Sequence, residues 1–273
     1  MPSSVLILEY DGPQFNGFQK QESAKRVTVQ GKLETILSQI LRENITLVAA
    51  GRTDAGVHAK GMAVSFTSQN PIQNYGKLIL SVNAIAGLEG GLAVLTANEV
   101  PDGFHARFSC TEREYEYKIL NTQTPHPLLK ERALWFKNKI DFNLLQREME
   151  SLIGKHDFAS FTKKSVLETY TSTERRITKI EIKEDEELKN LFKIVIRGTG
   201  FLHNMVRILV GTLLDIARGK IRSSVLEILE SLDRTKAGKT APPYGLYFVR
   251  AYYNDYPIVN HLYSQIYKNV EIV

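Results

Sequence analysis

A short segment of the chain combines a carboxylate, a cation and a glycine at close spacing. Within residues 51–59, Arg52 lies two positions before Asp54, and Gly56 lies two positions after it. Gly56 can adopt backbone angles that a side chain would forbid, so the segment can turn tightly and bring its backbone close to a ligand. Arg52 is permanently cationic and would keep Asp54 ionised if the two side chains met. We therefore predict a reactive carboxylate in a turn; a solvated turn with a surface ion pair is the alternative.

Two other segments hold polar side chains in apolar settings. Over residues 113–120, Tyr115 and Tyr117 alternate with charged residues, which indicates a strand with both tyrosines on its apolar face. Arg207 falls within residues 202–217, whose apolar positions have helical spacing. A buried arginine would need an anionic partner, because an unpaired buried charge destabilises the fold. The same spacing would also suit an arginine on the exposed side of a helix.

The charge balance of the chain is mildly basic. Lysine and arginine together number 35 against 30 acidic residues, and the sequence pI is about 9.1. This excess is compatible with a polyanionic partner, and cations that bind phosphates would supply much of the affinity. Each candidate cation could equally be an ordinary solvated charge. The candidates are Lys20, Lys60, Arg107, Lys163, Lys164, Arg175 and Lys220.

The composition argues against several classes of site. The single cysteine, Cys110, rules out a disulfide within the chain and a cysteine-rich zinc site. The six histidines lack the spacing of metal ligands, so we expect no metal site. The first residues lack the pattern of a signal peptide, and no run of eighteen apolar residues occurs. We expect a soluble cytoplasmic protein with no membrane partner.

The elements around the carboxylate segment follow a regular order. Strands and helices alternate so as to favour an antiparallel sheet with helices packed on one face, an α+β unit. The expected strands cover residues 5–10, 46–50, 62–67 and 92–100, and the expected helices 29–41 and 75–82. Thr28 is expected to cap the first helix. Residues 1–104 would therefore form an N-terminal half that carries the carboxylate loop.

The remaining residues, 105–273, are expected to form a C-terminal α+β half that completes the site. The tyrosine strand opens this half, and an acidic tip at residues 184–187 joins two strands of a hairpin. The other expected elements are helices at 142–152, 202–217 and 223–231, hairpin strands at 176–182 and 191–197, and a final strand at 247–253. The two halves have a similar order of elements without a visible sequence repeat.

Taken together, these motifs resemble the tRNA pseudouridine synthase A (TruA-type) family. The resemblance covers nearly the whole chain in the right order, and residues 51–58 are its most specific part. The matching segments are residues 9–12, 29–31, 51–58, 104–109, 113–117, 156–158, 205–207, 240–243 and 245–246. The sequence departs from the family pattern at Phe18, Glu114 and Lys239, positions that bear on the range of substrates more than on the reaction.

The resemblance implies two similar α+β halves flanking a central basic cleft, in a homodimer without metal or cofactor. It implies isomerisation of uridine to pseudouridine at positions 38 to 40 of the tRNA anticodon stem-loop. The catalytic aspartate of the family falls on Asp54, and its substrate-contacting tyrosine falls on Tyr115. With Arg52 as a third catalytic candidate, the remaining substrate contacts are expected from Arg207, Lys20, Arg107, Lys163 and Lys164.

The implied reaction breaks the N1–C1′ bond, rotates the uracil, joins C5 to C1′ and removes the C5 proton. A carboxylate can attack C1′ to form an ester, or it can act as a base on the sugar. Since a base inside a stem must leave the stack, Arg52 is expected to hold the flipped nucleotide or to take its place. Tyr115 could stack on the uracil and accept the C5 proton. Either Arg52 or Arg207 could keep Asp54 ionised.

Two other functions remain open at the level of sequence. A non-catalytic RNA-binding or folding protein could keep the same cleft without turning over its RNA. A glycoside hydrolase would need a second carboxylate as acid. Asp157 is the other acid within a matched motif that could serve, and a role in a turn or cap is the simpler reading of it.

Overall fold

The structure is a computed structural model that describes residues 1–21, 27–88 and 90–268. It has mixed α and β composition and divides into two compact units. The first unit comprises Met1–Arg113 and Phe248–Val273, and the second comprises Glu114–Tyr247. The chain enters the second unit within strand β5 (Glu112–Leu120) and returns to the first within strand β10 (Leu246–Tyr252).

The sheet of the first unit has the order β4-β1-β3-β10, with β2 (Val48–Ala49) paired to β3 as well. Strand β1 (Ser3–Tyr10) lies antiparallel between β3 (His58–Thr67) and β4 (Leu92–Val100). The β1–β3 register shifts between Leu8 and Tyr10, so that Tyr10 pairs with Ala59 at the start of β3. This end of β1 therefore lies beside the end of the carboxylate loop.

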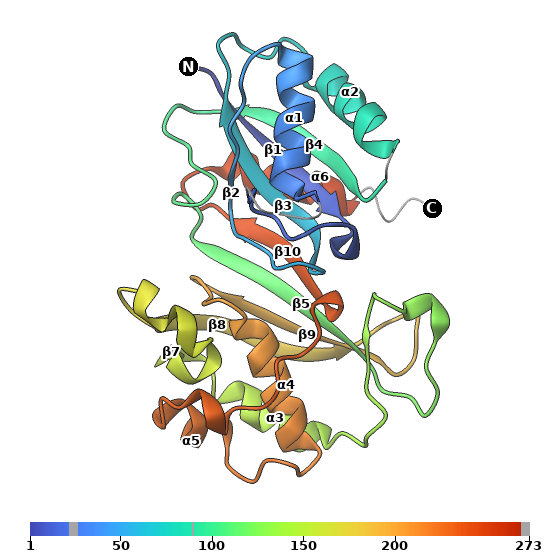
Figure 1. Ribbon diagram of the computed structural model, residues 1–273, viewed down its shortest axis with the longest axis vertical. Helices are drawn as coiled ribbons and strands as arrows, with labels where there is room; N and C mark the ends of the chain where they lie inside the picture. Colours follow the sequence, from blue (N-terminus) through green and yellow to red (C-terminus); the bar gives the residue numbers. More distant parts are fainter. Residues whose placement is uncertain (22–26, 89, 269–273) are drawn as a thin grey trace. The chain divides into compact units, whose positions relative to one another are not determined.

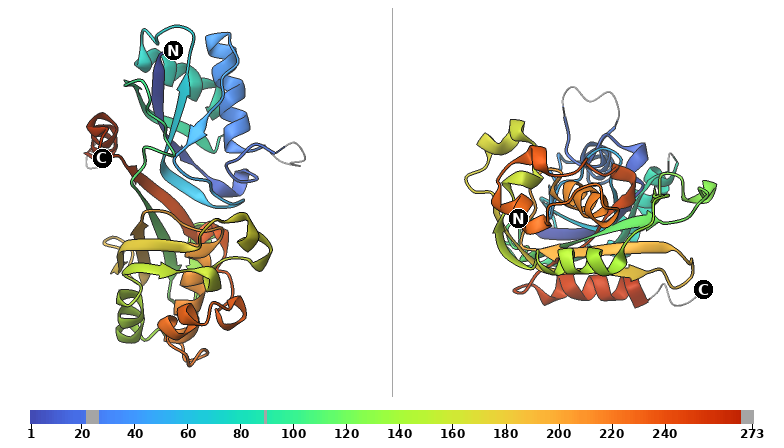
Figure 2. Two further views of the ribbon diagram at one scale, coloured as in Figure 1. Left: turned by 90° about the vertical axis from the view of Figure 1, so that its left-hand side faces the viewer. Right: turned by 90° about the horizontal axis from the view of Figure 1, so that it is seen from below.

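Helices cover both faces of this sheet. Figure 1 draws α1 (Val29–Leu41) and α2 (Tyr75–Gly87) in front of the strands and α6 (Pro257–Lys268) behind them, and the side view in Figure 2 separates the two layers. Consecutive residues of β1 from Val5 to Leu8 are fully buried, which requires cover on both faces. As expected, the Thr28 side chain caps α1 by accepting from the Gly31 N–H at 3.2 Å.

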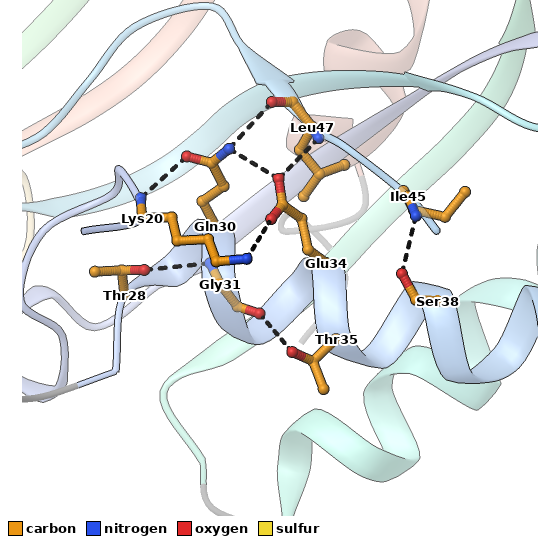
Figure 3. A network of polar contacts seen from close by, with 9 residues as sticks. All are labelled: Lys20, Thr28, Gln30, Gly31, Glu34, Thr35, Ser38, Ile45 and Leu47. Carbon is orange, nitrogen blue, oxygen red and sulfur yellow. Dashed lines mark hydrogen bonds and ion pairs between the residues drawn. The ribbon is translucent and has the colours of Figure 1, made fainter. Parts of the chain in front are cut away.

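A polar network ties α1 to two segments that lead toward the carboxylate loop (Figure 3). The Gln30 side chain accepts from the Lys20 N–H at 3.1 Å and donates to the Leu47 carbonyl at 3.3 Å. The buried Glu34 carboxylate accepts from the Leu47 N–H at 3.0 Å and from Gln30 Nε2 at 2.8 Å. Because buried polar groups need partners, this network fixes both segments against the helix.

The second unit has a sheet of order β5-β9-β8-β7, with the short β6 (Leu134–Trp135) parallel to β5. Strands β8 (Glu174–Glu184) and β9 (Leu191–Gly198) form the expected antiparallel hairpin, and β7 (Gly154–Asp157) extends it. The helices are α3 (Phe142–Glu150), α4 (Met205–Ala217) and α5 (Val225–Glu230). Most residues of α4 are buried, as its apolar sequence predicts.

The structure confirms the expected α+β class and the expected elements, with three differences. Residues 248–273 belong to the first unit, because β10 pairs with β3 and the Tyr263 hydroxyl donates to the Gly61 carbonyl at 2.8 Å. The two units therefore differ from the expected division into residues 1–104 and 105–273. Helix α6 had no counterpart among the expected elements. Because α6 covers the face of the first sheet opposite to α1 and α2, the expectation of helices on one face only is wrong for this unit.

The polar face of strand β5 is partly covered, since Glu116 is only 7% exposed. The Glu116 carboxylate lies 3.8 Å from Lys118 Nζ, on the same strand. In the described parts of the chain, no helix has the length and apolar character needed to cross a bilayer.

Candidate active site

The carboxylate loop lies between the end of β2 at Ala49 and the start of β3 at His58. Its turn is closed by the Val57 N–H, which donates to the Asp54 carbonyl at 3.1 Å. Gly56 has φ +82°, the left-handed backbone that its lack of a side chain was expected to permit. The Asp54 side chain is half-buried. The structure thus confirms the tight turn and leaves part of Asp54 accessible.

The last residue of β1 and the segment that follows it hold this loop in place. The Tyr10 hydroxyl and Thr53 Oγ1 are hydrogen-bonded at 2.8 Å in a buried position. The Phe18 N–H donates to the Thr53 carbonyl at 3.0 Å, and the Phe18 ring is buried against Tyr10. These contacts fix the backbone immediately before Asp54, and they come from a segment more than thirty positions away in the sequence.

Two glycines allow that segment to approach the loop closely. A Cβ atom on Gly17 would lie 2.8 Å from the Thr53 carbonyl oxygen and 3.3 Å from the Asp54 carbonyl carbon. A Cβ atom on Gly12 would lie 2.3 Å from the carbonyl carbon of Val57. Gly17 also has φ +80°, so a side chain there is disfavoured twice. The loop is therefore held by direct backbone-to-backbone packing.

His58 closes the far end of the loop. Its Nδ1 atom lies 3.1 Å from the Asp11 carboxylate and 3.2 Å from the Gly12 N–H. Nδ1 can donate to Asp11 when it is protonated and accept from Gly12 when it is not. Since the ring is buried, either contact ties the end of the loop to residues 11 and 12.

Arg113 links the residue before the loop to a second turn of the first unit. Its guanidinium donates to the Ala50 carbonyl at 3.0 Å, the Cys110 carbonyl at 3.3 Å and the Arg107 carbonyl at 2.7 Å. One planar cation therefore binds three backbone carbonyls from two segments. This arrangement fixes the strand that enters the carboxylate loop.

Arg52 and Lys20 are both exposed residues of the first unit. The Lys20 ammonium lies 3.7 Å from the Glu34 carboxylate. The expectation that Arg52 keeps Asp54 ionised and its expected role toward RNA both stay predictions.

The two tyrosines of β5, both in the second unit, have different surroundings. Tyr117 is fully buried, and its hydroxyl donates to the Pro242 carbonyl at 2.9 Å. Burial raises the pKa of Tyr117 far above its usual range, a shift that nearby Tyr244 reinforces and Arg207 opposes. Tyr115 is 8% exposed and meets Phe201 edge to face, with 5.1 Å between ring centroids. Tyr117 is thus a structural residue, and Tyr115 remains the candidate for contact with substrate.

Arg207 lies half-buried in α4 and is bound by neutral groups of the second unit. Its Nε donates to the Ala241 carbonyl at 2.8 Å, and its guanidinium donates to Asn204 Oδ1 at 2.8 Å. The Ala241 N–H donates back to the Arg207 carbonyl at 3.0 Å. Gly211 allows this close approach, since a Cβ there would lie 1.8 Å from the Lys239 carbonyl oxygen. These contacts orient Arg207 and dock residues 239–241 on α4.

The other predicted substrate contacts are surface residues. Arg107 is exposed in the first unit, and Lys163 and Lys164 are exposed in the second. Exposure is compatible with binding to phosphates, but it would also suit solvated charges. Lys220 is already engaged, since its Nζ lies 2.8 Å from the Asp215 carboxylate.

Asp157 has the local role expected of a turn residue. Its carboxylate accepts from the Ala159 N–H at 2.9 Å. Across the described ranges, no three side chains of the metal-ligating types gather as a metal site. The candidate residues that the structure describes are a carboxylate, Asp54, and a tyrosine, Tyr115, together with arginines that can bind anions.

Sequence reasoning missed the residues that position Asp54. Tyr10 and Arg113 lay in matched segments without assigned roles, and Gly17 lay outside them, because their contacts join segments distant in the chain. Two glycines in the segment after β1 were a usable signal, since glycine commonly marks close backbone approach.

Comparison with known proteins shows to which family the chain belongs. A family model described as tRNA pseudouridine synthase matches residues 6–109 and 149–254. The chain is 46% identical over 268 residues to the tRNA pseudouridine synthase A of Leptospira biflexa serovar Patoc, covering 97% of this chain and 98% of that protein. It is 50% identical over 206 residues to that of Leptospira interrogans, with 75% and 98% covered. It is 38% identical over 254 residues to that of Acetivibrio thermocellus, with 93% and 100% covered. The chain therefore belongs to the tRNA pseudouridine synthase family and is an isomerase that forms pseudouridine in tRNA.

Proposed function

We propose that the chain converts uridine to pseudouridine at positions 38 to 40 of the tRNA anticodon stem-loop, with Asp54 as the catalytic carboxylate. The observation that carries the proposal is the support of Asp54. Its backbone is fixed by Tyr10, Gly17 and Phe18, while its side chain is only half-buried. A reactive group gains from such preorganisation, because small misplacements cost large factors in rate.

The chemistry needs one carboxylate and one proton acceptor. In one route, Asp54 attacks C1′ as the N1–C1′ bond breaks, and uracil C5 later displaces the ester oxygen. In the other route, Asp54 removes a proton from the sugar carbon next to C1′ as the base departs, which leaves an unsaturated sugar; C5 then adds to C1′, and the sugar carbon takes its proton back. In both routes the proton on C5 then leaves to a base and N1 takes up a proton, so atoms and charge balance without any oxidant or external energy source.

Tyr115 is assigned to the uracil in this proposal. Its edge-to-face contact with Phe201 limits the orientations of its ring, and 8% of the residue is exposed. The hydroxyl would approach C5 and accept the proton there. The proposal requires Tyr115 and Asp54 to meet at one uridine, and Arg207 to supply a cation beside them.

Arg52 is assigned to the flipped nucleotide. A uridine within a stem must leave the stack before a side chain can reach its sugar. The Arg52 guanidinium is exposed, two positions from Asp54, and could fill the space that the base vacates. Binding to the remaining RNA would rest on phosphate contacts from Lys20, Arg107, Lys163 and Lys164. Affinity for tRNA should then fall steeply as salt rises.

The proposal also includes a cytoplasmic homodimer that acts on tRNA without metal or cofactor. Sedimentation of the purified protein with and without tRNA would measure the oligomeric state. A single sedimenting species with the mass of one chain at micromolar concentration would contradict the dimer.

The decisive experiment maps pseudouridine in unmodified tRNA transcripts after incubation with the purified protein. We expect new pseudouridine at positions 38 to 40 and release of tritium from C5-labelled uridine. Pseudouridine confined to other positions would contradict the assigned site. Binding without tritium release would support the non-catalytic alternative, and free uracil among the products would support hydrolysis.

A further inference from the structure

A turn of the first unit presents an aromatic ring to solvent without a structural reason in the fold. Phe108 is 78% exposed, although burial of an aromatic ring is strongly favoured. Among the described residues, Trp135 is the other exposed aromatic side chain, and its indole N–H donates to the Thr122 carbonyl. A single exposed apolar side chain is common on protein surfaces, so the case for Phe108 rests on the residues around it.

The turn holds this ring in one orientation. The His105 ring stacks on Phe108 with 4.3 Å between centroids and 23° between planes. His105 Nδ1 accepts from the Phe108 N–H at 3.1 Å, and the Ser109 N–H donates to the His105 carbonyl at 2.9 Å. The His105 imidazole therefore covers one face of the Phe108 ring. A ring fixed before binding loses little entropy when a partner stacks on it.

The base of the turn is anchored in the sheet. Ala106 is fully buried, its N–H donates to Ser65 Oγ at 3.1 Å, and its carbonyl accepts from the Tyr253 hydroxyl at 2.8 Å. Arg113 binds the Arg107 carbonyl and the Ala50 carbonyl at once. The aromatic turn and the residue that enters the Asp54 loop are therefore held by one side chain.

The charge of the turn indicates its partner. The Arg107 guanidinium is exposed and lies 5.7 Å from the Phe108 ring centroid. An aromatic surface next to an arginine is the combination by which proteins stack unpaired bases and hold the adjoining phosphate. Because the chain belongs to a family that acts on tRNA, an unpaired RNA base with its phosphate is the partner that this combination fits best.

We propose that the exposed face of Phe108 is a stacking platform for an unpaired base of the tRNA substrate, with Arg107 binding a neighbouring phosphate. The platform deepens the proposed function and rests on it. Arg113 binds the backbone of both the aromatic turn and the strand that enters the Asp54 loop. A base held at Phe108 therefore helps to place the target uridine. The platform contributes to binding and not to bond-making.

The first test compares tRNA affinity of three variants at one salt concentration. Phe108→Ala should weaken binding by about fivefold or more, because loss of one stacked base has an effect of that order. Phe108→Tyr, which keeps a ring, should bind like the unchanged protein. Leu128→Ala removes a side chain that is 94% exposed in the second unit and should change nothing. Binding by Phe108→Ala within twofold of the unchanged protein would overturn the platform.

A second readout reports stacking itself. The chain has one tryptophan, so Trp135→Phe gives a silent background in which Phe108→Trp adds a single reporter. Unmodified tRNA should quench its fluorescence, and emission that tRNA leaves unchanged would contradict base stacking. A change in oligomeric mass caused by Phe108→Ala without tRNA would also overturn the proposal, by making this surface an interface between copies.

The outcome is separable from that of the proposed function. Normal affinity in Phe108→Ala would remove the platform and leave the assignment of Asp54 intact. Normal turnover by Asp54→Asn would remove the proposed catalytic carboxylate whatever Phe108 does.

Discussion

The loop around Asp54 and the strand around Tyr117 are both held by distant segments, but different parts of each are held. Around Asp54 the contacts reach the backbone of Thr53 and leave the carboxylate half-buried. Around Tyr117 the contacts enclose the side chain, because its hydroxyl binds Pro242 and its ring covers Gly245. A fixed backbone with an accessible side chain suits chemistry, whereas an enclosed side chain suits stability.

This difference predicts opposite results for the two tyrosines of β5. Tyr115→Phe should bind tRNA normally and lower the single-turnover rate by about 10²–10⁴-fold, the range for loss of a general base. Tyr117→Phe should keep the rate and lower the free energy of unfolding by about 1–3 kcal/mol, because a buried carbonyl loses its donor. Single-turnover kinetics and denaturant unfolding measure the two effects. Near-normal turnover by Tyr115→Phe would reduce that residue to packing.

The next prediction concerns backbone support of the catalytic loop. Gly17→Ala places a methyl group 2.8 Å from the Thr53 carbonyl oxygen, so the loop must move. We expect kcat to fall by about tenfold to a hundredfold, since shifts near 1 Å have such effects. Gly103→Ala is the matched control, because Gly103 has φ +87° but no neighbour within 4 Å of the added atom. Equal losses of kcat in both variants would mean that contact with the loop is unimportant.

A smaller effect on kcat is expected from loss of the hydrogen bond between Tyr10 and Thr53. Tyr10→Phe removes the partner of Thr53 Oγ1 and should cost about 1 kcal/mol of unfolding free energy, with a smaller fall in kcat than Gly17→Ala. A double-mutant cycle with Thr53→Val measures the coupling. If the two changes were additive within error, the contact would not stabilise the loop.

The smallest effect on turnover is expected for a carboxylate that is fully paired. Asp215 in α4 is 7% exposed at its side chain and binds Arg218 at 2.5 Å and Lys220 at 2.8 Å. Burial opposes its ionisation, but the hydrogen bonds from Lys220 and Arg218 outweigh burial and lower the pKa of Asp215 below its usual 3.8. Asp215→Asn should therefore leave turnover unchanged and cost about 1–3 kcal/mol of unfolding free energy at neutral pH.

The stability that Asp215 contributes should depend on pH in a defined direction. A carboxylate with a lowered folded-state pKa stabilises the fold fully above its unfolded value and loses this contribution as pH falls through the folded value. The difference in unfolding free energy between Asp215→Asn and the unchanged protein should be constant above about pH 5 and shrink in acid. A difference that grew in acid would contradict the ion pairs.

Local rules predicted much of this structure, because they act through neighbouring residues. The cap at Thr28 and the turn at Gly56 depend on backbone geometry within a few positions, and both are present. The return of residues 248–273 to the first unit could not be read locally, since it depends on pairing between β10 and β3. The contacts of Arg113 with backbone carbonyls are equally invisible in sequence, because carbonyls carry no residue identity.

The candidate site divides in the same way. The identities of Asp54 and Tyr115 were available from motifs, and their supports were not. Arg52 illustrates the limit of spacing, because a separation of two residues in a turn does not fix where its guanidinium lies relative to Asp54. Side-chain direction in a turn depends on backbone angles that tertiary contacts set.

Tritium release from C5-labelled tRNA by Asp54→Asn tests the central claim most directly. Asp157→Asn serves as the control, because that carboxylate caps a turn by accepting from Ala159. We predict that Asp54→Asn binds tRNA with unchanged affinity and releases tritium more than about a thousandfold more slowly, while Asp157→Asn releases it at the normal rate. Tritium release by Asp54→Asn at a rate close to that of the unchanged protein would contradict the account.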